Sequence, residues 1–144
     1  MKHYNKAKEL FDMDAVEFTG AVSEEVIQKA ERTLNLTFPE SYRRFLKEFG
    51  AGDVGGEVVF GLLENEQENS DLDMLKITQV EHEYKMPKHM VVIFYNAFED
   101  CLYCLDTSQM TEGECPVVRV SSDYADVEEV AESFGAFLMD LVEE

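Results

Sequence analysis

The stretch SEEVIQKAERTLNLTFPESYRRFLKEFGAGDVGG, residues 23–56, decides the fold of this 144-residue chain. Ser23 can cap a helix through its hydroxyl, and Glu24 and Glu25 suit the positive end of the helix dipole. The apolar residues that follow recur at helical spacing and are Val26, Ile27, Ala30 and Leu34. This pattern predicts an amphipathic helix with one buried face.

A second amphipathic helix follows after a short break. Pro39 fits its first position, where a missing N–H has no cost, and Gly50 provides a stop. The apolar stripe between them consists of Tyr42, Phe45, Leu46 and Phe49. We interpret both stripes as core, because amphipathic spacing normally reflects packing. The glycine-rich turn at 52–56 then leads into a predicted strand at 57–62.

The other elements are shorter and are predicted from periodicity and turn residues. A first helix is expected at 4–12, followed by a connector at 14–20. Further strands are predicted at 75–77, 90–95, 101–105 and 117–120. Thr78 with Glu81 forms a capping-box pattern, which predicts a short helix at 79–84. Short connections between the later strands favour antiparallel pairing.

The C-terminal segment contains the clearest helical pattern in the sequence. Asp126 with Glu129 can cap a helix at its start. The apolar residues at helical spacing are Val127, Val130, Ala131, Phe134, Phe137, Leu138, Leu141 and Val142. This apolar stripe must pack against another surface, and a face of the predicted sheet is available for it. We therefore predict one α+β domain, residues 1–144, with a mostly antiparallel sheet of about five strands flanked by N-terminal helices and a C-terminal helix.

The charge of the chain is extreme for its length. It has 31 acidic and 12 basic residues, which give a formal net charge of −19. A field of this sign repels nucleic acids and anionic membranes, so direct binding to either is not expected. The same field speeds encounter with a basic protein, although a high net charge also serves solubility alone.

The cysteines and the lack of targeting patterns favour a reducing cytoplasm. The three cysteines are an odd number, and neither a leader peptide nor an apolar run of about 20 residues is evident. Cys101 and Cys104 form a lone C-x-x-C, but residues three apart in a strand point to opposite faces. Cys115 is a third metal ligand only if the fold brings it near. We predict reduced thiols and no metal site.

The residues predict no catalytic or cofactor-binding site. His3, His82 and His89 belong to no ligand or triad pattern, and His82, between two glutamates, is expected to be solvated. The turn at 52–56 follows a helix and precedes a strand, the reverse of a phosphate-binding loop. The acidic segment 64–73 lacks the ligand spacing of an EF-hand. An enzyme that uses an acid pair would also need a nucleophile or cofactor loop, and none is evident.

The order of these motifs carries a family resemblance. The capped helix is followed by the break LTFP at 36–39, the Tyr-x-x-Phe-Leu helix and the glycine-rich turn. Later come PKHMVVI at 87–93, a strand introduced by proline, and DCLYCLDT at 100–107, an acidic, aromatic strand ending in Asp-Thr. Over residues 20–142 the chain resembles the SUKH superfamily, the Smi/Knr-like proteins. Phe38 stands where that family usually has leucine.

The resemblance implies which residues shape the fold. The positions that match the family signature are Tyr42, Phe45, Asp53, Gly55, Gly56, Phe60 and Asp106. We expect them to build the fold rather than to contact a partner. A groove between the helices and the sheet is the place where they would meet.

The resemblance also implies a function. Bacterial SUKH proteins are typically immunity proteins, which bind a cognate polymorphic toxin and neutralise it, and many such toxins are nucleases. Because a nuclease needs a cationic cleft for phosphate, a partner with a charge of −19 suits it. The hypothesis is therefore a stoichiometric, non-catalytic inhibitor of a toxin, without a cofactor. The alternative is an intracellular regulatory or scaffold protein that binds endogenous proteins, like the fungal relatives.

The densest run of acids supplies the candidate contact surface. Five acids and no base lie between positions 64 and 73: Glu64, Glu66, Glu68, Asp71 and Asp73, with Asp53 and Asp123 as secondary candidates. The alternative is that these acids only keep a loop solvated. A homodimer is compatible with the apolar residues on more than one side of the C-terminal segment, such as Phe134 and Phe137.

Overall fold

A computed structural model describes residues 2–11, 17–64 and 70–143. The α-helices in these ranges are α1 (Lys2–Phe11), α2 (Glu24–Leu34), α3 (Glu40–Glu48), α4 (Met74–Glu83) and α5 (Phe134–Glu143). The strands are β1 (Glu17–Phe18), β2 (Gly52–Val54), β3 (Glu57–Val59), β4 (Met90–Asn96), β5 (Cys101–Asp106), β6 (Val117–Ser121) and β7 (Val127–Ala131). Two short 3-10 helices are η1 (Ser70–Leu72) and η2 (Thr107–Gln109).

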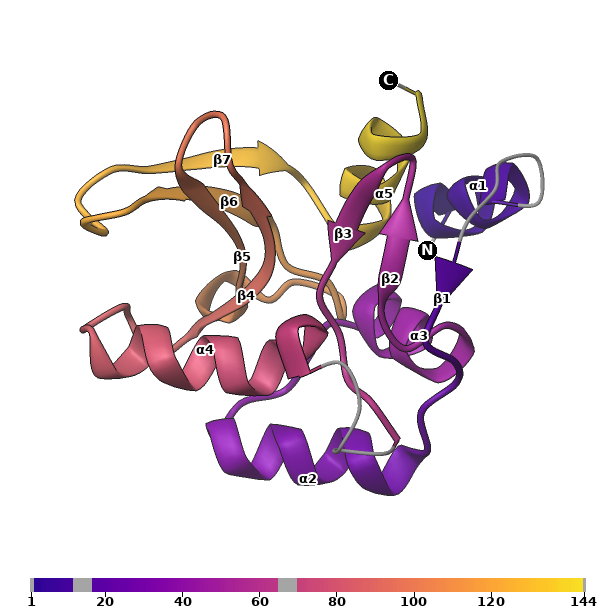
Figure 1. The fold of residues 1–144 in the computed structure, drawn as a ribbon, viewed down its shortest axis with the longest axis horizontal. Helices are drawn as coiled ribbons and strands as arrows, with labels where there is room; N and C mark the ends of the chain where they lie inside the picture. The colour runs from indigo at the N-terminus through magenta and orange to yellow at the C-terminus, as the bar shows by residue number, and fades with distance from the viewer. Residues whose placement is uncertain (1, 12–16, 65–69, 144) are drawn as a thin grey trace.

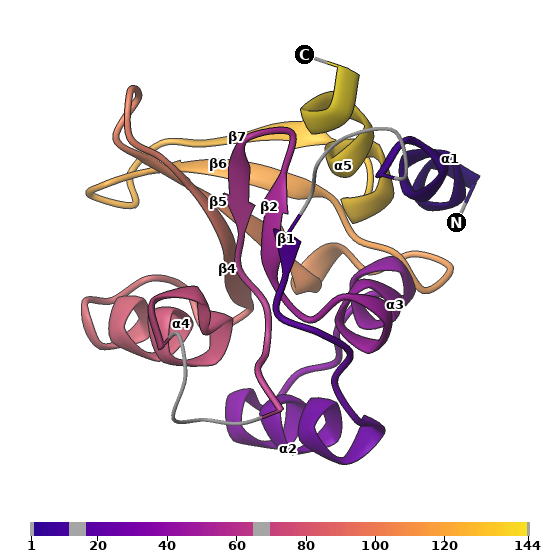
Figure 2. The same cartoon turned by 45° about the vertical axis from the view of Figure 1, so that its right-hand side comes forward.

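The fold is α+β, as expected, but its strands form two sheets instead of one. Within the described ranges, β1-β2-β3 and β4-β5-β6-β7 are both antiparallel, and each follows chain order. Figure 1 shows the larger sheet on one side, α1 and α5 on the other, and α2 with α4 below. Figure 2 shows that β2 and β3 lie between the larger sheet and the α1–α5 pair.

The helices α2 and α3 are the two amphipathic helices that the sequence pattern predicted. Ser23 caps α2, with its hydroxyl accepting a hydrogen bond from the Val26 N–H at 3.4 Å. Pro39 is the residue before α3 rather than its first residue, and it makes no side-chain cap. Gly50 ends the segment in a left-handed conformation, with φ of 81°.

The smaller sheet depends on a tight turn at Gly55 and Gly56, where φ is 60° and 86°. This turn joins β2 to β3, and Asp53 and Val58 pair across it. The sequence predicted the turn and β3 but neither β1 nor β2. Strands of two and three residues are too short to show an alternating pattern.

The helix α4 is longer than predicted and replaces the strand expected at 75–77. Asp73 starts it, because its carboxylate accepts a hydrogen bond from the Leu75 N–H at 2.9 Å. Thr78 lies inside the helix instead of capping it. Its buried hydroxyl accepts a hydrogen bond from the Val92 N–H at 3.0 Å, which joins α4 to the larger sheet.

The expected C-terminal helix begins eight residues later than Asp126, because its predicted first half is strand β7. Val127 to Ala131 pair with β6, and Arg119 faces Glu128 across the two strands. The β-branched residues of this segment suit a strand as well as a helix. The true cap is Ser133, whose hydroxyl accepts a hydrogen bond from the Ala136 N–H at 3.1 Å.

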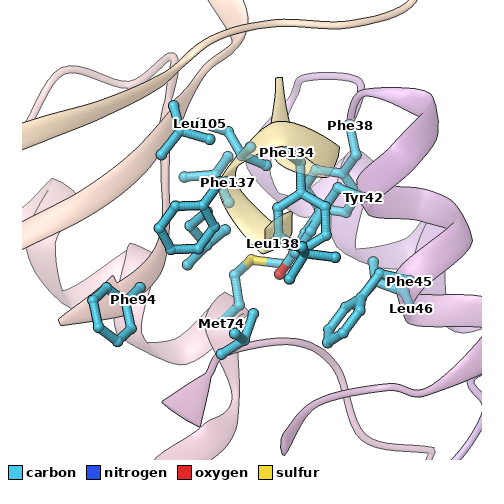
Figure 3. Packing of buried hydrophobic residues seen from close by; sticks show 14 of the residues in the cluster. Phe38, Tyr42, Phe45, Leu46, Met74, Phe94, Leu105, Phe134, Phe137 and Leu138 are labelled. Carbon is cyan, nitrogen blue, oxygen red and sulfur yellow. The ribbon is translucent and has the colours of Figure 1, made fainter. Parts of the chain in front are cut away.

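A row of aromatic rings crosses the core from α3 to the larger sheet. The ring centroids of Tyr42 and Phe134 are 4.9 Å apart, and those of Phe134 and Phe137 are 6.3 Å apart. Phe137 then lies 5.8 Å from Phe94 of β4. Figure 3 shows this row, with Phe94 and Phe137 on the side of the larger sheet. The first turn of α5 is thus central to the core, and its last turns reach the edge of the sheet.

Candidate protein-binding site

The acidic loop that the sequence favoured as a contact surface is only partly visible. Glu64 is exposed and accepts a hydrogen bond from the Ser23 N–H at 2.9 Å, which ties it to the start of α2. Asp71 is exposed on η1. Glu66 and Glu68 lie outside the described residues. Asp73 is 7% exposed and caps α4, so we remove it from the candidate contact surface.

The two secondary acids form turns at other places in the fold. Asp53 accepts a hydrogen bond from the Gly56 N–H at 2.8 Å in the β2–β3 turn. Asp123 lies between β6 and β7, where the Ser121 hydroxyl and the Ala125 N–H donate to it and lower its pKa. The structure therefore distributes the predicted acids over three regions instead of gathering them on one surface.

Several signature residues lie inside the fold. Tyr42 and Phe45 are fully buried, and the Tyr42 hydroxyl donates to the Phe60 carbonyl oxygen at 2.8 Å. Burial and the nearby Asp73 carboxylate raise the pKa of Tyr42. The Phe60 N–H in turn donates to the Ile93 carbonyl at 2.8 Å and joins the segment after β3 to β4.

Asp106 holds the turn after β5. Its carboxylate accepts hydrogen bonds from Ser108 and from the Gln109 amide, and His89 lies 3.4 Å away. Burial by itself raises the pKa of Asp106, but these hydrogen bonds outweigh it, so the pKa lies below its ordinary value. The buried carboxylate is satisfied locally, which supports a structural role.

A pocket of about 190 Å³ opens between β3, the β4–β5 hairpin, β7 and α5. Its aromatic lining consists of Phe94, Tyr103 and Phe137. Its polar lining consists of Glu57, Asn96 and Asp140, and Val130 and Leu141 complete it. In Figures 1 and 2 the β2–β3 turn, the β4–β5 turn and the end of α5 all reach the same end of the molecule. None of the seven signature residues lines this pocket, so it is not the groove of signature residues that the resemblance led us to expect, although Gly55 lies beside its wall.

The pocket carries negative charge that no neighbouring cation neutralises. Glu57 and Asp140 are exposed and have no hydrogen-bond or salt-bridge partner among the described residues. Tyr103 donates its hydroxyl hydrogen bond to Glu99 at 2.9 Å, and burial together with that bond raises its pKa. Arg119 lies opposite Tyr103 across β5 and β6 and interacts with its side chain, but its ion pairs are with Glu99 and Glu128 and not with Glu57 or Asp140.

The β4–β5 turn beside the pocket presents a fully exposed phenylalanine, Phe98. The Asn96 side chain accepts hydrogen bonds from the N–H groups of Phe98 and Glu99, at 3.0 and 3.1 Å. The Tyr95 hydroxyl donates to Asp100 at 2.8 Å and braces the other side of the turn. A rigid turn that exposes an aromatic ring is typical of an anchor in a protein interface.

One histidine and two cysteines are buried in the fold. His82 is buried and its Nε2 lies 2.9 Å from the Met90 carbonyl oxygen, so the expectation of a solvated side chain is wrong. Its place on the inner face of α4 explains the burial. Cys104 and Cys115 are buried thiols whose pKa is raised by burial, Cys115 to about 12. The described residues include no cluster that could hold a metal ion.

A comparison with protein-family models shows the family to which the chain is related. The family model described as SMI1-KNR4 cell-wall, a SUKH model, matches residues 2–143. The chain belongs to the SUKH family. The match covers nearly the whole sequence and both sheets of this SUKH protein, so the resemblance carried by the signature motifs is confirmed.

The SUKH family is generally linked to immunity, and its members are generally non-catalytic. Binding a partner protein is the property that this relationship suggests for a SUKH chain. No helix in the described ranges is both long enough and apolar enough to cross a membrane.

The sequence did not indicate the pocket of this SUKH protein. Its residues come from five separate elements, and Glu57 and Asp140 belong to no dense run of acids. The available signal was Tyr103 inside the aromatic strand that matches the family. Only the assembled fold places Tyr103 beside α5.

Proposed function

We propose that this chain is an immunity protein that binds a cognate bacterial polymorphic toxin as a stoichiometric, non-catalytic inhibitor. The observation that carries the proposal is the SUKH match across residues 2–143. We further propose a similarity to the Bacillus protein YobK, and we extend the family's link with immunity to this chain on the basis of the family match. The chain acts as one domain and needs no cofactor.

We further propose that the toxin is a nuclease. Its catalytic cleft must attract phosphate and is therefore cationic, whereas this chain has a net charge of −19. Opposite charges steer two proteins together and raise the association rate. Three free cysteines suit the reducing cytoplasm of the producing cell, where such a toxin would otherwise act.

Co-expression tests the proposal directly. The toxic C-terminal domain encoded beside this gene is induced in cells with and without the chain, and growth and the stoichiometry of the purified complex are measured. We expect rescue and a one-to-one complex, with nuclease activity lost in proportion to added inhibitor. Absence of both rescue and binding would overturn the proposal.

Charge reversal then tests how the acids contribute. Changing Glu64 and Asp71 to lysine should slow association at low salt, with little effect at high salt where charges are screened. An unchanged association rate would remove these two acids from the contact surface. Light scattering of the free chain over a range of concentrations tests for a homodimer.

The second candidate is an intracellular regulatory or scaffold protein that binds endogenous proteins. The exposed Phe98 on its braced turn favours a protein partner under either function. The two functions differ in the partner recovered: a toxin encoded next to the gene, or several cellular proteins encoded elsewhere.

A further inference from the structure

We infer that the pocket between β3, the β4–β5 hairpin and α5 is the receptor for an arginine side chain of the bound protein. The inference rests on the proposed function only in assuming that the chain binds a protein. It adds a specific site and the chemistry of the residue that fills it. The site lies apart from the Glu64–Asp71 region that the density of acids favoured.

The inner wall of the pocket is aromatic on three sides. The ring centroids of Phe94 and Tyr103 are 5.2 Å apart, and Phe137 lies 5.8 Å from each. Phe94 and Phe137 are 5% and 3% exposed, so their rings form a floor that is almost closed by their neighbours. Aromatic rings in this arrangement attract a cation through their negative faces, and guanidinium groups also stack on them.

The rim of the pocket supplies the negative charge. Glu57 reaches it from the start of β3 and Asp140 from α5, so two elements separated in the sequence contribute a carboxylate each. Neither carboxylate is paired within the described part of the chain. No lysine or arginine is among the residues that line the pocket. Charge complementarity therefore requires a cationic occupant.

Arginine fits this lining better than lysine does. A planar guanidinium can stack on the half-buried Tyr103 ring and donate hydrogen bonds to carboxylates such as those of Glu57 and Asp140. A lysine ammonium is a compact, strongly hydrated charge that loses more by leaving water. A volume of about 190 Å³ accommodates a guanidinium group and its adjoining methylene groups.

The walls of the pocket are set before any partner arrives. A Cβ on Gly55 would lie 2.6 Å from the Leu141 carbonyl oxygen, so only glycine lets the β2–β3 turn approach α5 so closely. Asn96 is fixed by its hydrogen bonds within the β4–β5 turn. A preformed site loses little conformational entropy on binding. The exposed Phe98 on the same turn extends the contact beyond the pocket.

The first test uses a probe that does not require the toxin. N-acetyl-arginine methylamide is titrated into the ¹⁵N-labelled chain, with the citrulline analogue as the uncharged control of the same shape. We expect saturable shifts at the amides of Tyr103, Phe137 and Leu141 with arginine and none with citrulline. The variant E57Q/D140N should lose the shifts, whereas E83Q/E129Q, which removes two exposed and unpaired acids elsewhere, should keep them.

Two results would overturn the inference. Shifts spread over the acidic surface and equal in both double variants would show only nonspecific attraction. Equal shifts with N-acetyl-lysine methylamide would remove the preference for a guanidinium. Both double variants change surface residues with the same change in net charge, so loss of folding does not confuse the comparison.

The second test uses the toxin domain and separates this inference from the proposed function. We expect E57Q/D140N to weaken the complex about tenfold and E83Q/E129Q less than about twofold. Equal affinities for the toxin would overturn the pocket as the contact site while leaving the immunity function intact. If the unmodified chain fails to bind the toxin, the immunity proposal fails, and the arginine titration still decides the pocket.

Discussion

Two regions of this SUKH protein combine aromatic rings with carboxylates, and they differ in whether an arginine of the chain pairs with those carboxylates. In the cluster of Tyr4, Arg44 and Glu48, the guanidinium carbon of Arg44 lies 5.3 Å above the Tyr4 ring. Arg44 also pairs with Glu48 at 3.1 Å, and the Tyr4 hydroxyl donates to Glu48 at 2.7 Å. In the pocket, Glu57 and Asp140 line the same space as three aromatic rings, and neither pairs with a cation of the described residues.

The difference shows what each region does. The Tyr4 cluster joins α1 to α3, and Lys8 pairs with Glu48 as well, so every charged group there contributes to folding. The pocket has the same kinds of groups, but its two carboxylates form no hydrogen bond or ion pair with other described residues. An arginine of a bound protein in the pocket would stack on a ring and pair with a carboxylate, as Arg44 does with Tyr4 and Glu48 within this chain.

The largest effect is expected from Gly55→Ala, which breaks the wall of the pocket. Gly55 has a positive φ, and its new Cβ would meet the Leu141 carbonyl at 2.6 Å, so we expect a loss of about 3 kcal/mol in the free energy of unfolding. Gly56→Ala is the matched control, because its φ is also positive but no atom lies within 4 Å of the new Cβ.

Urea denaturation of both variants measures the contrast. We expect about 1 kcal/mol of destabilisation for Gly56→Ala, which reflects the backbone conformation alone. The excess loss in Gly55→Ala reports the contact with α5. Equal losses would mean that this contact does not hold the wall in place.

Gly135→Ala is expected to break the other region, with a loss of about 2 kcal/mol. The new Cβ would lie 2.7 Å from the Tyr4 backbone nitrogen, so α1 must shift away from α5 and the Tyr4 cluster loosens. Helix propensity alone predicts the opposite sign, a gain of about 1 kcal/mol. A stability equal to or above that of the unmodified chain would therefore contradict the close approach of α1.

The elements of the fold differ in how far the sequence predicts them. The amphipathic helices α2 and α3 and the strands β4, β5 and β6 follow from periodicity, because each has enough residues to show it. The segment at β7 was predicted as helix, since Val127, Val130 and Ala131 recur at helical spacing and only pairing with β6 makes the segment a strand. Local pattern carries no information about that pairing.

The candidate site was less predictable than the fold. Charge density selected Glu64 and Asp71, which stay predictions, and it also selected Asp73, which is buried as a helix cap. A run of acids shows where charge is dense but not which carboxylates are already satisfied. The pocket acids are found only from the assembled fold, in which Glu57 and Asp140, 83 positions apart in the sequence, line the same pocket as Phe137.

Glu48→Gln tests the Tyr4 cluster through the pH dependence of the free energy of unfolding. Burial by itself raises the pKa of Glu48, but the hydrogen bonds from Lys8 and Tyr4 outweigh it and the pKa is lowered from 4.5. The carboxylate therefore stabilises the fold above about pH 4.5, and this contribution is lost as the pH falls through the lowered value. We expect the variant to be about 1 kcal/mol less stable at pH 7.

Thermal unfolding of Glu48→Gln and the unmodified chain between pH 3 and pH 7 checks the sign. The two stabilities should converge as the pH falls, because the protonated carboxyl resembles the amide. Glu83→Gln, at an exposed and unpaired position on α4, is the control and should change stability little at any pH. A constant difference between Glu48→Gln and the unmodified chain across the whole range would contradict the role of the charge.

The smallest effect on stability is expected where the effect on binding is largest. Because Glu57 and Asp140 are exposed and have no partner among the residues that the structure describes, E57Q/D140N should change the free energy of unfolding by less than about 0.5 kcal/mol. Removing two negative charges from a chain at −19 also reduces self-repulsion, so a small gain is the favoured sign. Urea denaturation at low salt measures it, beside E83Q/E129Q. A loss near that of Glu48→Gln would mean that the pocket carboxylates hold the fold together, and the contrast between the filled and the open region would disappear.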